Sequence, residues 1–484
     1  MKLKYLYKIL LLLCVIVTSV SCSSSGEAGE DPTLMVSTTE VSFEPDGGTS
    51  DISLTTNGTW TVSNPATSWL QINNTSGGSG TATITITSGM NGSQLTRTAT
   101  ITVTSSNGQV RRITVTQTGN LYPSYNLNTI PADASGMSSN AVELAAKIKL
   151  GWNIGNTLEA IGGENAWGNP NITKEYVETI KNLGFNAVRL PCSWDQFSNQ
   201  TTAKIDQVWM DRVKEVVQYC VDNDMYVLLN IHWDGGWLEK NCTPAKKESV
   251  NAKQKAFWEQ IATAMRDFDE HLMFASANEP EVHDAVEMEV LHSYHQTFVN
   301  TVRATGGRNS YRVLVIQGPG TNIERSDELM DMPTDEIEGR MMAEVHYYTP
   351  SQFCILFEDV SWGNMAYYWG EGYHSEIEPE RNATYGEEDA VDASMALAKT
   401  KFVDKGVPVI LGEYGVYRRD NAQYVPQDLE AHNNSVDHWI RYVTKQAIAN
   451  GLIPFWWDTG GAVDRANFTV KDQRTIDAII ASGN

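Results

Sequence analysis

Positive charge is scarce in this sequence. It has 36 Lys and Arg against 59 Asp and Glu, which gives a formal net charge of −23 at pH 7. A chain this acidic is repelled by nucleic acid and by anionic membrane surfaces, so neither is an expected partner. The charge is compatible with binding a neutral polymer such as a glycan, and it favours solubility in a secreted protein.

Three signatures of metalloproteins and serine hydrolases are also missing. The nine His show no HExxH spacing, no GxSxG motif occurs, and the six Cys include no CxxC pair. These absences argue against a zinc peptidase, a serine hydrolase and a structural metal site. We therefore predict that the protein uses no metal and no cofactor. A disulfide that involves Cys242 is left open.

The N-terminus has the pattern of a secretory leader. Three Lys precede the apolar run 9–17, which is too short to span a membrane, and small residues then lead to Cys22. Residues 1–22 resemble a bacterial lipoprotein signal, which implies a lipidated Cys22, a flexible tether over 23–33 and membrane contact only through this anchor. We expect an outer-membrane lipoprotein at the cell surface. The alternative is a periplasmic or secreted protein in which Cys22 is incidental.

Residues 34–119 are rich in Thr, Ser, Gly and Asn. Three runs, 81–87, 98–104 and 112–116, alternate apolar and polar residues, as half-buried strands do. Turn signals separate the runs, so we predict a small all-β, immunoglobulin-like sandwich of about seven strands. The 484 residues therefore hold at least two domains.

This small domain resembles a BACON domain, a module often attached to bacterial carbohydrate-active enzymes. Trp60 and Trp69, each in a short strand-like pattern, and the final run 113–117 carry the resemblance. Two roles stay open, a glycan-binding module and a spacer with both Trp in its core, and we favour the spacer. Residues 120–140 contain Pro123 and Pro131 and are expected to form a polar linker.

Residues 141–484 alternate short apolar runs with amphipathic stretches. Eight apolar runs occur, at 151–155, 187–190, 226–231, 272–277, 312–316, 342–345, 407–411 and 452–456. Eight strand–helix units predict an α/β fold, a (β/α)8 TIM barrel. An open doubly wound sheet is the alternative, but no glycine fingerprint follows the first run.

The active site of such a barrel lies at the carboxyl ends of its strands. Polar or aromatic residues stand at or just after seven of the eight runs: Asn156, Glu159, Arg189, His232, Asn278, Glu279, His346, Tyr348, Glu413 and Trp457. The fifth run, which ends in Gln317, adds no candidate. Taken singly, Arg189 could equally well form a structural ion pair, and each His could equally well be a core residue. Their convergence on one rim indicates a catalytic site.

Glu279 and Glu413 follow the fourth and seventh runs, so they would face each other across the barrel mouth. Two such carboxylates split a glycosidic bond when one is protonated and the other is ionised. The remaining candidates are placed to support them: an ion pair to Glu413 from Arg189, a hydroxyl donor to Glu413 from Tyr348, an orienting contact to the acid from His346, a sugar hydroxyl contact from Asn278, and a floor under the sugar from Trp457.

Together these motifs resemble glycoside hydrolase family 5, and the stretch 151–160 is similar to its subfamily 4. The resemblance implies a retaining enzyme with Glu279 as acid/base and Glu413 as nucleophile. It implies a supporting group and a set of sugar contacts: Arg189, His232, Asn278, His346 and Tyr348 for the first, and Asn156, Glu159 and Trp457 for the second. Trp233 stands where many relatives have a second His, and it offers an aromatic face instead.

The subfamily resemblance further implies an endo-β-1,4-glucanase that cleaves plant β-glucan, with xyloglucan as the first polymer to test. The alternatives are a cellulase, a mixed-linkage glucanase or a mannanase, and, in another class, a non-catalytic surface protein that binds glycan. Among the aromatic residues of 349–405, four close together either stack on sugars or pack the loop: Trp362, Tyr367, Tyr368 and Trp369. We expect a monomer.

Overall fold

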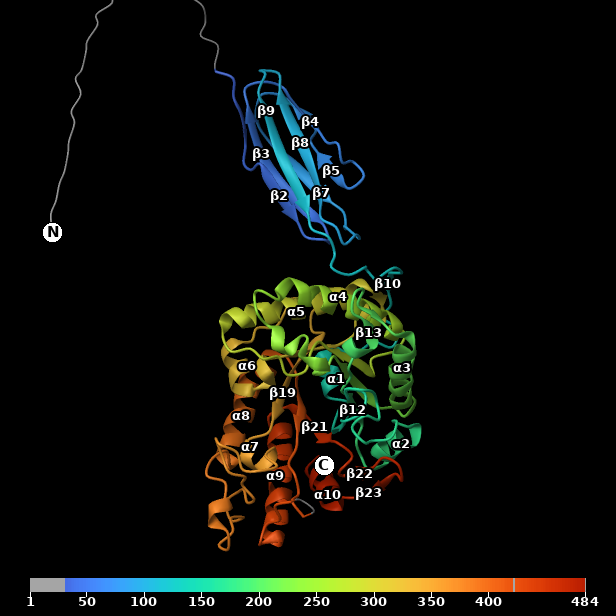
Figure 1. Ribbon diagram of the computed structural model, residues 1–484, viewed down its shortest axis with the longest axis vertical. Helices are drawn as coiled ribbons and strands as arrows, with labels where there is room; N and C mark the ends of the chain where they lie inside the picture. The colour runs from blue at the N-terminus through green and yellow to red at the C-terminus, as the bar shows by residue number, and fades with distance from the viewer. Residues whose placement is uncertain (1–30, 421–422, 484) are drawn as a thin grey trace, which may run out of the picture. The chain divides into compact units, whose positions relative to one another are not determined.

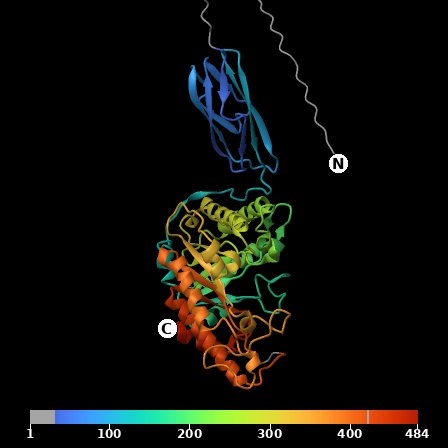
Figure 2. The same cartoon turned by 90° about the vertical axis from the view of Figure 1, so that its left-hand side faces the viewer.

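The structure is a computed structural model that describes residues 31–420 and 423–483. The predicted leader, with Cys22, and the tether up to residue 30 lie outside the described residues. The chain forms two compact units, which meet in the sequence at Gly119 and Asn120, and Gly92–Gln94 belongs to the second (Figures 1 and 2). Within the described ranges, no helix combines the length and the apolar character needed to cross a bilayer.

The first unit is a two-sheet β-sandwich, as predicted. One sheet has four strands and the other has five: β1 (Leu34–Val36), β3 (Gly48–Thr56), β7 (Gly80–Ser88) and β5 (Leu70–Asn73) in the first, and β2 (Glu40–Phe43), β9 (Val110–Gln117), β8 (Arg97–Ser105), β4 (Trp60–Ser63) and β6 (Ser76–Gly77) in the second. The sandwich has two strands more than the expected seven. These two, β1 and β6, are only three and two residues long, too short to show in the sequence pattern.

Alternation places the apolar side chains of these strands between the two sheets. Ile84 and Ile86 of β7 and Ile101 and Val103 of β8 are fully buried. Trp60 is also in the core, and Trp69 is partly buried with the Arg97 guanidinium 4.5 Å from its ring centre. Both Trp therefore contribute to packing, which is the arrangement expected of a spacer.

Residues 120–140, expected to be a polar linker, instead pack along the second unit. The backbone amides of Tyr125 and Asn126 donate to the Glu259 carboxylate, and the Tyr125 hydroxyl donates to the carbonyl of Thr202. Strand β10 (Ile130–Ala132) pairs in parallel with β17 (Gly306–Gly307). The polar composition of this segment reflects backbone and side-chain hydrogen bonds to the barrel rather than free solvation.

The second unit is a closed barrel of eight parallel strands, which confirms the predicted fold. Each of the eight apolar runs supplies one strand, in sequence order around the barrel: β11 (Gly151–Ile154), β12 (Ala187–Leu190), β15 (Tyr226–Asn230), β16 (Leu272–Ala275), β18 (Leu314–Gln317), β19 (Met341–Tyr347), β20 (Val409–Tyr414) and β21 (Leu452–Asp458). Side chains such as Leu228, Met273 and Phe455 fill the interior, so the barrel is a packed core and not a pore.

Helices cover the outside of the barrel (Figure 1). The structure has them at α1 (Ala141–Ala145), α2 (Lys174–Asn182), α3 (Gln207–Asp222), α4 (Lys247–Met265), α5 (Ala285–Ala304), α6 (Ile323–Leu329), α7 (Ser351–Cys354), α8 (Glu388–Lys401), α9 (Leu429–Ala449) and α10 (Gln473–Gly483). Acidic caps start several of them: the carboxylate of Asp206 accepts the amide of Val208, and Asp284 caps α5 in the same way. Such a cap stabilises a helix by about 1 kcal/mol.

A β-bulge interrupts the pairing of β19 with β20. Val345 pairs with Leu411, but the next residue, His346, pairs with Glu413, so Gly412 is one extra residue in β20. A bulge bends its strand and changes the direction of the side chains that follow. This irregularity immediately precedes Glu413.

Candidate active site

Glu279 and Glu413 face each other across the carboxyl end of the barrel. Glu279 follows β16, and Glu413 is on β20. One oxygen of each and one ring nitrogen of His346 all lie within 4.8 Å of one another. Retaining glycosidases hold their two carboxyl groups about 5–5.5 Å apart, whereas inverting enzymes leave about 6.5–9.5 Å for a water. The spacing of the two glutamates in this site is therefore the short spacing of retaining enzymes.

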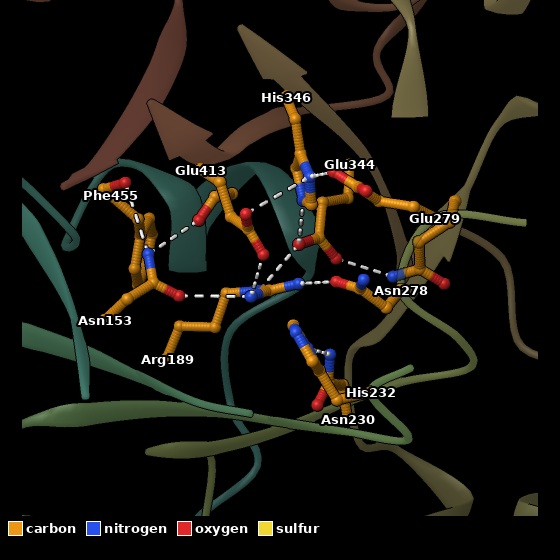
Figure 3. A network of polar contacts seen from close by, with 12 residues as sticks. Asn153, Arg189, Asn230, His232, Asn278, Glu279, Glu344, His346, Glu413 and Phe455 are labelled. Carbon is orange, nitrogen blue, oxygen red and sulfur yellow. Dashed lines mark hydrogen bonds and ion pairs between the residues drawn. The ribbon is translucent and has the colours of Figure 1, made fainter. Parts of the chain in front are cut away.

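Arg189 of β12 is fully buried at the centre of the polar network (Figure 3). Its Nη1 donates to Glu413 Oε1 at 2.7 Å, its Nη2 to Asn278 Oδ1 at 2.8 Å and its Nε to Glu344 Oε1 at 2.8 Å. Burial works against the charge, but Glu344 and Glu413 outweigh it and raise the pKa of Arg189. A fourth side chain, Asn153, accepts from Nη1 at 3.0 Å, so the guanidinium is a permanent cation that orients four side chains.

The carboxylate of Glu413 is enclosed and held on both oxygens. Its second oxygen accepts from the Tyr348 hydroxyl at 3.0 Å, and the His346 ring lies 3.7 Å away. Burial raises the pKa of Glu413, while the charges of His346 and Arg189 restrain that rise. The donors fix the direction of this carboxylate, as a nucleophile requires.

His346 links the two glutamates. Its Nδ1 lies 2.7 Å from Glu279 Oε1, and its Nε2 lies 3.2 Å from Glu344 Oε1. Burial opposes a charge on the ring, but the surrounding carboxylates, Glu413 and Glu279 foremost, raise the pKa of His346 to about 9. This imidazole therefore carries a positive charge at neutral pH.

A second histidine has the opposite character. Burial, together with the charges of Arg189 and His346, lowers the pKa of His232 well below its ordinary value, so the ring is neutral. Its Nδ1 is 3.2 Å from the Asn230 side-chain amide (Figure 3), and the ring stacks on Trp457 with centroids 5.8 Å apart and planes only 7° from parallel. His232 thus supports the aromatic face of Trp457.

Comparison with known proteins agrees with this geometry. The family model described as cellulase, glycosyl hydrolase family 5, matches residues 152–463, and that of the viral BACON domain matches residues 33–120. The chain belongs to glycoside hydrolase family 5.

Two similar proteins of family 5 match this chain over both of its units. The xyloglucan-specific endo-beta-1,4-glucanase BoGH5A of Bacteroides ovatus is 35% identical over 471 residues, which are 94% of this chain and 91% of that protein. The structure of a Bacteroides ovatus GH5 xyloglucanase with a XXXG heptasaccharide is 34% identical, with a TM-score of 0.70 over 93% of this chain and all of the other.

A third relative covers the barrel. It is XEG5B, a GH5 xyloglucan-specific beta-1,4-glucanase from a ruminal metagenomic library, solved in complex with XXLG. It is 39% identical, with a TM-score of 0.66 over 71% of this chain and 96% of the other.

The three residues predicted to contact sugar, Trp457, Asn156 and Glu159, lie in different surroundings. Trp457 is half-buried, and a cavity of about 640 Å³ opens beside it and Tyr348. Asn156 adopts a positive φ of 58° in the loop after β11. Glu159 is only 3% exposed, and its carboxylate accepts from the backbone amides of Asn156 and Thr157, so it holds the backbone of this loop. Burial raises the pKa of Glu159 to about 7.

Several side chains of the site escaped the sequence analysis, and three of them are acids or an amide beside the two glutamates. Glu344 and Gln317 are fully buried and joined by a 2.5 Å hydrogen bond, although the strand that ends in Gln317 was expected to add nothing. Glu239 accepts the backbone amide of Glu279 at 2.7 Å, and burial raises its pKa to about 7. A lone acid inside the apolar run of β19 was the signal for Glu344. Glu239 lies in a short 3-10 helix, Glu239–Asn241, and gave none.

The aromatic residues of the long loop after β19 mostly pack the loop. Tyr367, Tyr368 and Trp369 are 4% exposed or less, whereas Trp362 is 63% exposed. Trp233 is 39% exposed and has the Lys240 ammonium 5.7 Å from its ring centre. Of the aromatic residues named from the sequence, Trp362 and Trp233 are therefore the exposed ones.

Cysteines and candidate metal ligands add no further chemistry. The four cysteines outside the leader, Cys242 among them, are free and buried. Within the described part of the chain, one group of side chains has ligand atoms close enough to share an ion, namely Glu279, His346 and Glu413. These atoms belong to the two facing glutamates and to the histidine that links them, so the polar network already described accounts for the group.

Proposed function

We propose that this family 5 enzyme is a retaining endo-β-1,4-glucanase whose preferred substrate is xyloglucan. The pairing of Glu279 and Glu413 within 4.8 Å carries the reaction type. The substrate is supported by the xyloglucan-specific relative, which matches 94% of this chain, including the small β-domain.

In the first step, Glu413 attacks the anomeric carbon. Its carboxylate oxygen forms the bond to this carbon while the bond to the leaving oxygen breaks, and Glu279 transfers its proton to that oxygen. Arg189 and Tyr348 hold Glu413 in line, and Asn278, bonded to Arg189 at 2.8 Å, is placed to contact the sugar 2-hydroxyl. The products are a glycosyl ester on Glu413 and a new free chain end.

In the second step, water replaces the enzyme. Glu279, now ionised, takes a proton from a water that attacks the same carbon, and Glu413 leaves as a carboxylate. Two inversions at one carbon restore the β-configuration. The exposed position of Glu279, with a side chain 43% open to solvent, gives this water access.

A broader β-1,4-glucanase is the second candidate. Similar solved structures include a broad-specificity GH5-4 endoglucanase from Ruminococcus champanellensis, 30% identical with a TM-score of 0.60. The exposed Trp362 and Trp233 are compatible with branched and with unbranched chains.

Product analysis on a polysaccharide panel tests both candidates. We expect the highest kcat/KM on tamarind-type xyloglucan, lower values on mixed-linkage glucan and carboxymethylcellulose, and no turnover of mannan or xylan. Proton NMR of the first products should show the β-anomer. Initial α-anomer would rule out the retaining mechanism, and inactivity on every β-glucan would rule out the proposed function.

We also propose that the enzyme is a lipoprotein of the outer cell surface, anchored through Cys22. The support is the sequence pattern of residues 1–22. Metabolic labelling with an alkynyl fatty acid should mark the wild type but not Cys22→Ser, and protease added to intact cells should remove the enzyme. A wild type that remains unlabelled and soluble would contradict this proposal.

A further inference from the structure

Glu344 is a third carboxylate in the site, and its side chain has no exposed surface. Its Oε1 accepts from Nε of Arg189 at 2.8 Å and from Nε2 of His346 at 3.2 Å. Its Oε2 accepts from the side-chain amide of Gln317 at 2.5 Å. Burying a carboxylate is costly unless charge partners and hydrogen bonds compensate it, and these donors do so.

The backbone of β20 leaves space for this carboxylate. A Cβ atom at Gly412 would lie 2.0 Å from Glu344 Oε1 and 2.7 Å from its Cδ, so only glycine fits. Gly412 is also the extra residue of the bulge that precedes Glu413. One backbone irregularity therefore seats Glu344 and aims Glu413 into the site.

The position of Glu344 determines which nitrogen of His346 carries a proton. Burial disfavours a charge on Glu344, but Arg189 and His346 outweigh it and lower the pKa of Glu344, so this carboxylate acts only as an acceptor. The His346 nitrogen that faces it, Nε2, must then donate. The other nitrogen, Nδ1, is left to accept a proton from the acid form of Glu279 or to donate one to its ionised form.

We propose that Glu344 is a positioning residue for the reaction: its ionised carboxylate holds the Nε2 proton of His346 and the Nε of Arg189, so that a single mobile proton is shared between Nδ1 of His346 and Glu279. The charged and titratable groups that face Glu344 and His346 come from five strands or their ends: Arg189 of β12, His232 after β15, Glu279 after β16, Tyr348 after β19 and Glu413 of β20. The inference rests on the proposed hydrolase function.

The first test is Glu344→Gln, which removes the charge and keeps the shape. We expect kcat to fall about 100-fold, the cost of a misplaced catalytic group, with KM changed less than about twofold. The basic limb of the kcat/KM profile should move to lower pH. Without the negative charge, the proton shared by His346 and Glu279 is held less tightly.

A double variant separates the charge from the packing. In Glu344→Gln alone, the new amide group faces the amide group of Gln317, and two donors meet. Adding Gln317→Glu restores an acceptor there and the net charge, but it places the charge on β18, away from Arg189 and His346. We expect this double variant to recover the wild-type Tm while kcat and the basic limb stay shifted.

Another buried glutamate provides the matched control. Glu378 is 6% exposed and accepts from the Tyr368 hydroxyl and the Gln427 backbone amide, so its partners differ from those of Glu344 and His346. Glu378→Gln should change Tm but leave the pH profile of activity as in the wild type. A shifted profile in this control would mean that the profile reports stability, and the proposal would fall.

Nitrogen-15 NMR of histidine-labelled enzyme observes the proton directly. In the wild type, His346 Nε2 should remain protonated across the working pH range, and in Glu344→Gln its pKa should fall. If neither variant moves the pH profile, or if the double variant recovers kcat together with Tm, Glu344 is only structural. A wild type inactive on all glucans would overturn the proposed function instead, and the NMR titration would still decide the role of Glu344.

Discussion

The two sides of the catalytic cleft differ in how they hold a glutamate. Glu279 has a side chain 43% exposed, and His346 contacts its carboxylate at 2.7 Å. Glu413 is 7% exposed, and Arg189 and Tyr348 each hold one of its oxygens. A group that exchanges protons with water needs access, whereas a group that attacks carbon needs a fixed direction. The difference in surroundings supports the roles that we propose for the two glutamates.

The largest expected loss of activity follows a substitution of the enclosed glutamate, Glu413. Glu413→Gln removes the nucleophile, so turnover of xyloglucan should fall about 10⁶-fold, the scale on which a hydrolase loses activity with its nucleophile. No glycosyl-enzyme should form, and mass spectrometry with a slow fluorinated substrate should detect an adduct on the wild type only. An adduct on the variant would show that another residue attacks.

On the open side the loss should depend on the leaving group. Glu279→Gln removes the general acid, which costs about 10²–10⁴-fold on a polysaccharide. An aryl glycoside with an acidic phenol needs no protonation, so its first step should be nearly normal, and a burst of phenol should precede a slow second step. Equal losses on both substrates would place the acid elsewhere.

We expect the stability of the fold to depend on pH through His346, which lies between the two glutamates. The pKa of His346 is about 9 in the folded protein and about 6.5 in an unfolded chain, so its protonation stabilises the fold below pH 6.5 by about 3 kcal/mol. This contribution is lost as the pH rises through 9. Chemical unfolding of the barrel at pH 6, 7.5 and 9 should show the decline in the wild type and a flatter curve in His346→Gln. Parallel curves would contradict it.

The smallest effect concerns one hydrogen bond. Tyr348→Phe removes the hydroxyl that donates to Glu413, and a bond to a charged group contributes about 1.5–3 kcal/mol, so kcat should fall about 10- to 100-fold. Tyr347→Phe is the control, because the buried hydroxyl of Tyr347 has no partner among the described residues. We expect it to keep full activity. Equal kinetics of the two variants would remove Tyr348 from the site.

Much of the barrel can be predicted from the sequence, because its strands are apolar runs and its functional groups stand where those runs end. The same rule explains why Arg189, Asn278 and the two glutamates, named from sequence, lie together in one network. Chain positions far apart meet in such a fold because parallel strands present one common end.

Residues inside strands were harder to predict. Glu344 lies in an apolar run, where the pattern indicates only core, and its bond to Gln317 joins residues 27 positions apart. Its spacing of two from His346 placed it on the same face of the strand, which was the available signal. Glu159 was named from its place at the rim, but a residue type at a rim does not reveal that neighbouring backbone amides bind it.

Residues 120–140 also determine how the barrel would bear a mechanical load. A pull on the chain ahead of Tyr125 meets the hydrogen bonds to Glu259 of α4 first, and the pairing of β10 with β17 next. Both precede α1 and β11 along the chain, and β11 carries Asn153, whose side chain accepts from Arg189 at 3.0 Å. Tension on the N-terminal side is therefore borne first by contacts outside the eight barrel strands, and it reaches β11 only after these contacts break.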